Sequence, residues 1–184
     1  TPKELEVTQK GTLTYNGLAQ EVLLDIKGIE FGDEIEFNKI TQKDAVIDKV
    51  VSLVSNSEKA TNYTFDNVLV TVAKKAITVT ANSKTKVYGE SDPELDYEVT
   101  GLVNGETKAV LSGNLLREEG ENVRTYDIEI GSLSSNNYEI EFNSAELEIK
   151  RKELVVTQKG TLTYNGLEQE VLLDIKGIIE GDSL

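Results

Sequence analysis

Carboxylates, tyrosines and lysines are the side chains most able to do chemistry in this sequence. Histidine and cysteine are both absent, so the chain offers no imidazole base, no thiolate nucleophile and no His/Cys metal cage. Residues 90–96 (ESDPELD) place Asp92, Glu94 and Asp96 close together. Calcium takes about six to eight oxygen ligands, so these three carboxylates are the candidates for a Ca²⁺ site, although their order is not that of an EF-hand.

A second chemistry open to the chain is hydrolysis by two paired carboxylates. With 33 acidic residues, close pairs of acids arise by chance, and no motif marks a cleft. The sequence therefore favours a protein that is not an enzyme and needs no cofactor, with Ca²⁺ as the one ion to consider. An amide cross-link from Lys3 or Lys75 to an asparagine of a late strand is a further hypothesis.

Three tyrosines recur at matching places in the chain. Tyr15, Tyr88 and Tyr164 each follow the leading apolar residue of a strand by ten or eleven positions. Tyr15 and Tyr88 are the candidates for a sugar-stacking ligand site. Packing beneath a tight turn explains the recurrence better, and the absence of tryptophan weakens the carbohydrate hypothesis. We expect both rings to occupy equivalent positions, buried under the turns that follow them.

The charge of the chain limits its partners. Its net charge is −14, which repels nucleic acid and anionic lipid surfaces, because both recruit basic side chains. No run approaches the ~20 apolar residues of a membrane helix, so we expect no membrane insertion. The first residue is not methionine, which suggests a piece of a longer polypeptide that is anchored through parts outside it.

The elements that position these side chains are repeated. Residues 4–33 and 153–182 are identical at all but four of thirty positions, at an offset of 149. A weaker repeat, in which a base precedes alternating apolar residues that end in Val-Thr, begins near Leu5, Ile77 and Leu154 and divides this period. The sequence therefore predicts a module A at 1–75, a module B at 76–151 and a truncated second copy of A at 152–184.

Alternating apolar residues predict that the modules consist mainly of strands. The apolar positions slip by one near Asn143-Ser144, which predicts a bend there. Asn16-Gly17 predicts a tight hairpin, residues 44–54 a strand, and residues 105–112 a short helix. The module junctions at 74–76 and 150–152 contain no Gly, Pro or Ser spacer. The expected fold is therefore all-β, with small β-sandwich-like or β-grasp-like modules joined end to end into a stiff rod.

Several motifs of module B resemble a known family. Residues 86–95 (KVYGESDPEL), 97–102 (YEVTGL), 115–120 (LLREEG) and 137–140 (NYEI) are similar to the Tyr-Gly-type MBG repeat of bacterial surface proteins. Module A, with LTYNG at 13–17, resembles the YDG repeat, with Asn16 where that repeat usually has Asp. The resemblance implies β-rich stalk or adhesin repeats at the cell surface, and no catalytic residues.

The resulting expectation is a non-enzymatic, extracellular stalk, spacer or adhesin fragment, with a glycan- or mucin-binding module as the alternative. Its expected partners are neighbouring modules of the same polypeptide and a host glycan or protein. About 33 residues cannot bury a stable core alone, so another segment must cover the apolar side chains of residues 152–184. We expect this tail to dock on a neighbouring chain, by strand exchange into its module A or by pairing of two tails.

Overall fold

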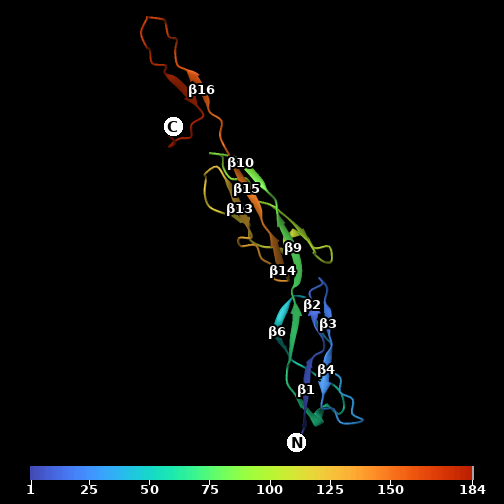
Figure 1. Cartoon of the computed structure of the whole chain (residues 1–184). Coiled ribbons are helices and arrows are strands. Elements are labelled where there is room, and N and C mark those ends of the chain that lie inside the picture. The colour runs from blue at the N-terminus through green and yellow to red at the C-terminus, as the bar shows by residue number, and fades with distance from the viewer. Residues whose placement is uncertain (184) are drawn as a thin grey trace.

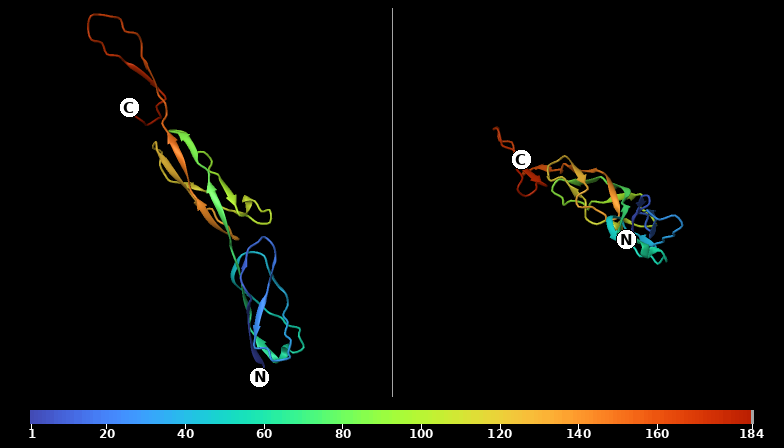
Figure 2. Two further views of the ribbon diagram at one scale, coloured as in Figure 1. Left: turned by 45° about the vertical axis from the view of Figure 1, so that its right-hand side comes forward. Right: turned by 90° about the horizontal axis from the view of Figure 1, so that it is seen from below.

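The computed structural model describes residues 1–183, and its regular secondary structure consists almost entirely of strands (Figure 1). The strands form three successive groups, and within the described residues no strand of one group pairs with a strand of another. The groups lie end to end along an elongated molecule, with the N-terminus at one end and the last hairpin at the other (Figures 1 and 2). The all-β fold predicted from the sequence is confirmed.

Module A is the first group. Its central strand β1 pairs antiparallel with β4 and parallel with β7, while β8 pairs parallel with β2 and antiparallel with β6. A short ladder joins β3 to β5. The elements are β1 (Lys3–Gln9), β2 (Leu13–Thr14), β3 (Gln20–Val22), β4 (Leu24–Lys27), β5 (Ile40–Gln42), β6 (Val46–Val51), the 3₁₀ turn η1 (Ala60–Asn62), β7 (Tyr63–Phe65) and β8 (Val68–Ala73).

Module B repeats the same plan. Its strand β9 pairs antiparallel with β11 and parallel with β14, and β10 runs parallel to β15 as β2 does to β8. Strands β13 and β12 extend the second sheet. The elements are β9 (Lys75–Ala81), β10 (Lys84–Val87), β11 (Tyr97–Thr100), the 3₁₀ turn η2 (Lys108–Val110), β12 (Leu116–Arg117), β13 (Thr125–Glu129), β14 (Tyr138–Asn143) and β15 (Ala145–Lys150).

The tail contains one antiparallel pair, β16 (Val155–Gln158) and β17 (Leu173–Lys176). Its register, Val155 opposite Lys176, is that of Glu6 opposite Lys27 in module A. All four side chains of β16 are exposed, so the hairpin reproduces the start of module A without its core. The structure holds a single chain, so strand exchange between chains stays a prediction.

Alternating side chains of the two sheets build the interior of module B. Ile77, Val79 and Ala81 point inward from β9, and Leu147 and Ile149 from β15, each at most 5% exposed. This is the pattern expected of strands with one buried face. Module A has two smaller buried clusters, one around Val68 and Val70 and one around Leu5.

The short helix expected at 105–112 is present as the three-residue 3₁₀ turn η2, with the Thr107 hydroxyl accepting from the Ala109 amide. So short an isolated segment gains little from a full α-helix. The hairpin prediction is wrong. The chain turns at Asn16-Gly17, but β2 and β3 do not pair, since each finds a partner elsewhere in module A. The strand predicted at 44–54 is confirmed by β6, and the predicted bend separates β14 from β15.

The connections between the groups are short. Lys74 alone separates β8 from β9, and residues 151–154 separate β15 from β16. The first junction therefore leaves little freedom between modules A and B, as the absence of a spacer predicted. Within residues 1–183, no helix has the length and apolar character needed to cross a membrane.

Candidate functional site at the module joints

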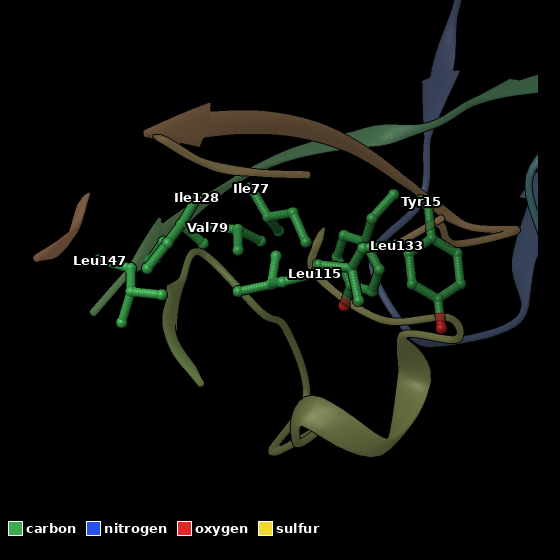
Figure 3. Packing of buried hydrophobic residues seen from close by; sticks show 9 residues of the cluster. Tyr15, Ile77, Val79, Leu115, Ile128, Leu133 and Leu147 are labelled. Carbon is green, nitrogen blue, oxygen red and sulfur yellow. The ribbon is translucent and has the colours of Figure 1, made fainter. Parts of the chain in front are cut away.

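A tyrosine of module A is buried inside module B. Tyr15 follows β2, and its backbone amide donates to the Ala73 carbonyl at 2.8 Å. Its ring is 3% exposed and belongs to the hydrophobic cluster of module B. Figure 3 shows it beside Leu133, at one end of a row of buried side chains that continues to Leu147. The ring packs edge-on against Tyr138, with centroids 5.3 Å apart.

Glu106 holds the two tyrosines together. The Tyr15 hydroxyl donates to Oε1 of Glu106 and the Tyr138 hydroxyl to Oε2, each at 2.5 Å. The Val103 amide donates to the Tyr138 hydroxyl at 3.1 Å. One carboxylate therefore binds hydroxyls from both modules, and hydrogen bonds to a charged acceptor are the stronger kind.

Close backbone approach completes this first joint. Gly17 has φ +80°, and a Cβ added to it would lie 2.7 Å from Cβ of Asn104, so a larger residue would force the modules apart. Polar contacts flank the approach: the Ala45 amide donates to Oδ1 of Asn137 at 2.9 Å. The Lys74 ammonium donates to the Ser135 carbonyl, also at 2.9 Å.

The joint between module B and the tail repeats part of this arrangement. Tyr88 follows β10, and its amide donates to the Lys150 carbonyl at 2.8 Å, as that of Tyr15 does to Ala73. Its hydroxyl donates to Oδ1 of Asp182 at 3.0 Å. A Cβ on the neighbouring Gly89 would lie 2.4 Å from Cδ1 of Ile179. Tyr88 is half-buried in this joint.

The acids that accept hydrogen bonds from the tyrosine hydroxyls lie on a repeated turn. Its sequence is Gly-x-x-x-Gly followed by an acid, at residues 28–33, 101–106 and 177–182. All six glycines have positive φ. In module A the Tyr63 hydroxyl donates to Oδ2 of Asp33 at 2.7 Å and accepts from the Glu30 amide at 3.0 Å. Each complete module thus ties its turn to its own tyrosine, and the turns at Glu106 and Asp182 also bind the tyrosine of the preceding module.

The carboxylates raise the pKa values of the tyrosines that they bind. The hydrogen bond to Glu106, together with burial, raises the pKa of Tyr15 to about 12. Burial, with the Glu106 hydrogen bond, raises the pKa of Tyr138, and the hydrogen bond to Asp182 raises that of Tyr88. The phenols therefore stay protonated as donors through the physiological range.

The candidate calcium ligands do not converge. Asp92 accepts from Lys86 and Arg117, Asp96 pairs with Lys84 at 2.9 Å, and Glu94 is exposed. Within residues 1–183 no group of three or more acidic side chains is placed to hold a metal ion. The acidic stretch thus supplies ion-pair partners to basic residues of its own module.

Lys86 is the buried member of this ion-pair network. Its side chain is 3% exposed, and its ammonium lies 2.6 Å from Oδ1 of Asp92 and 2.5 Å from Oε2 of Glu121. Burial lowers its pKa, but the hydrogen bonds and the negative charges of Asp92 and Glu121 together outweigh burial, so the pKa is raised. The hydrogen bond from Arg117, then that from Lys86, lowers the pKa of Asp92. The charges compensate one another, which is the condition for keeping an ammonium inside a fold.

The predicted equivalence of Tyr15 and Tyr88 agrees with the matching strand positions of the two residues. The prediction that the turn after Tyr15 covers its ring was wrong, because module B covers the ring instead. Sequence reasoning also missed Glu106 and Asp182. The recurrence of the Gly-x-x-x-Gly-acid turn, one per module, was the signal that could have found them.

Comparison with known families matches residues 77–148 to the MBG domain of the YGX type. The resemblance predicted for module B is confirmed, and this domain is a repeat of bacterial surface proteins. The match does not reach module A or the tail, so their likeness to YDG repeats stays a prediction. No curated protein and no solved structure matches the chain.

Proposed function

We propose that this chain is a stiff spacer from the extracellular stalk of a bacterial surface protein, without enzymatic activity. The observation that carries the proposal is the burial of Tyr15, from module A, in the hydrophobic cluster of module B. A flexible array of independent domains would leave such a side chain in its own domain or in solvent.

Two separate connections fix the relative orientation of modules A and B. The covalent link between β8 and β9 has one residue, Lys74, and limits bending at one side of the joint. The Tyr15 loop enters module B from a different strand and hydrogen-bonds Glu106. Two attachment points restrain twist as well as bend, which is what a stalk needs in order to project a distal part away from a surface.

The acidic surface suits the same role. A net charge of −14 keeps neighbouring stalks apart by mutual repulsion and keeps the chain solvated. Membership of residues 77–148 in a surface-protein repeat family supports the extracellular location. The sugar-stacking alternative has less support, because Tyr15 is buried and the Tyr88 hydroxyl is bound to Asp182.

Small-angle X-ray scattering of the whole chain tests the proposal. We expect a rod whose maximum dimension matches the extended structure and stays constant between low and high salt. A pair-distance distribution that requires bent and extended populations would contradict stiffness. A glycan array is the matched test of the alternative: saturable binding to a defined glycan would replace the spacer by an adhesin module.

A further inference from the structure

The loop between β16 and β17 contains an exposed copy of the loop that forms the first joint. Residues 159–167 read KGTLTYNGL, as residues 10–18 do. Tyr164 is 92% exposed, whereas Tyr15 is 3% exposed. Leu162 and Leu167 in the same loop are 48% and 76% exposed. The loop therefore exposes an aromatic ring and two leucines to solvent. We call residues 159–168 the tip loop.

The tip loop already has the conformation of its counterpart. The backbone amide of Leu167 donates to Oδ1 of Asn165 at 3.0 Å, and the side-chain Nε2 of Gln169 donates to the Thr163 carbonyl at 2.9 Å. The equivalent bonds from Leu18 and Gln20 in module A are both 2.9 Å. Both bonds join residues within 163–169, so the loop sequence itself is sufficient to set this shape. A preformed loop loses less conformational entropy on binding.

The structure also shows what covers such a loop. In module A the matching loop, identical over residues 10–18, packs on module B, with Tyr15 on Tyr138 and Glu106, and with Gly17 against Asn104. The other joint combines different types: Tyr88-Gly89 of module B faces the turn of an A-type segment. In both joints, a loop of one module type meets the turn of the other type.

The turns of the two module types also differ at the position that faces the loop. Gly17 approaches Asn104 so closely that a Cβ would lie 2.7 Å from the asparagine Cβ. In the A-type turns, Phe31 and Glu180 occupy the position of Asn104. A fully exposed phenylalanine side chain or a second carboxylate there changes both the space and the charge that the A-type loop would meet.

We propose that the tip loop is a docking surface for a YGX-type MBG module. The Tyr164 hydroxyl donates to the acid at the position of Glu106, and its ring packs edge-on against the tyrosine at the position of Tyr138. Gly166 lies against the residue at the position of Asn104. The inference depends on the geometry of the first joint and holds whether or not the molecule serves as a stalk.

The test uses the full chain as both donor and acceptor. In the unmodified chain the module B site is filled by its own Tyr15, which the short tether favours. The acceptor therefore carries Tyr15→Ala, which empties the site, and Tyr164→Ala, which prevents self-association. The donor is the unmodified chain with a fluorophore at its N-terminus, and fluorescence anisotropy with sedimentation velocity measures the complex.

We expect saturable one-to-one binding of donor to acceptor. Donor Tyr164→Ala should bind at least tenfold more weakly, and donor Tyr164→Phe should fall between the two because it keeps the ring and loses the hydroxyl. Adding Glu106→Ala to the acceptor should weaken binding of the unmodified donor as much as Tyr164→Phe does. The affinity of the Tyr164→Phe donor should be the same for the acceptors with and without Glu106→Ala.

A second acceptor protects the test against misfolding. Gly17→Val, combined with Tyr164→Ala, keeps Tyr15 but drives the loop away from Asn104 and opens the same site by another route. Circular dichroism confirms that each acceptor is folded. Equal binding of donors with and without Tyr164, or absence of a complex with both folded acceptors, overturns the proposal. Scattering by single chains is unaffected by that outcome, so the spacer function is judged separately.

Discussion

At the scale of single residues, Glu106 connects two modules because its two oxygens serve two hydroxyls. Tyr15 and Tyr138 are 3% and 1% exposed, so neither hydroxyl has ready access to water as a substitute acceptor. A buried donor that loses its acceptor costs about 1–3 kcal/mol. The stability of the joint should therefore respond to Glu106 far more than to the many exposed acids.

We predict that Glu106→Ala lowers the free energy of unfolding by about 2 kcal/mol or more, measured by urea denaturation. Glu98→Ala is the matched control: that carboxylate is 71% exposed and pairs with Lys108 on the surface, so its loss should change stability by less than about 0.5 kcal/mol. Equal effects of the two substitutions would show that Glu106 is one more surface acid.

Tyr15 predicts a loss of stability in alkali. Its pKa is raised to about 12 from an ordinary value of 10.0, so the folded joint holds the proton more tightly than the unfolded chain does. The resulting stabilisation is complete below pH 10 and is lost as the pH rises through 12. Tyr15→Phe, which cannot ionise, should flatten the alkaline fall in urea midpoint; unchanged curves would contradict the assignment.

At the scale of elements, the strands could be predicted from alternation, and their partners could not. Tyr138, Ile140 and Phe142 alternate with polar residues, which was sufficient to place β14. Nothing local indicated that β14 runs parallel to β9, since parallel partners are distant in sequence. The hairpin at Asn16-Gly17 failed for the same reason: the turn is local, but β2 pairs with β8.

The single-residue link between β8 and β9 yields a prediction about motion. Insertion of a short Gly/Ser segment after Lys74 should leave the Tyr15 loop as the main restraint, so the modules should tumble partly independently. Amide ¹⁵N relaxation would then give modules A and B different rotational correlation times, whereas the unmodified chain gives one common value. The same insertion within the exposed loop 118–124 of module B serves as the control. A common value in all three proteins would mean that the Tyr15 loop alone fixes the joint.

At the scale of the whole molecule, the duplication of residues 4–33 in 153–182 predicted repeated β-rich segments, and the strands lie in three groups end to end. The division at 1–75, 76–151 and 152–184 stays a prediction. The candidate site was predicted in part. Tyr15 and Tyr88 were identified by their recurrence, but their cover lies in another segment of the chain. The pairing of a loop with the turn of the following segment depends on how the modules stack, which no local pattern encodes.

The central claim is that the Tyr15–Glu106 contact, together with the one-residue link at Lys74, holds modules A and B in one orientation. The chain has no cysteine, so spin labels can be placed at Thr41→Cys in module A and Glu141→Cys in module B, both exposed positions. Double electron–electron resonance then measures the distance distribution between the modules. We predict one narrow peak for the unmodified joint and a broad distribution once Tyr15→Ala and Glu106→Ala are added. A broad distribution in the unmodified joint, or a narrow peak that survives both substitutions, would contradict the claim.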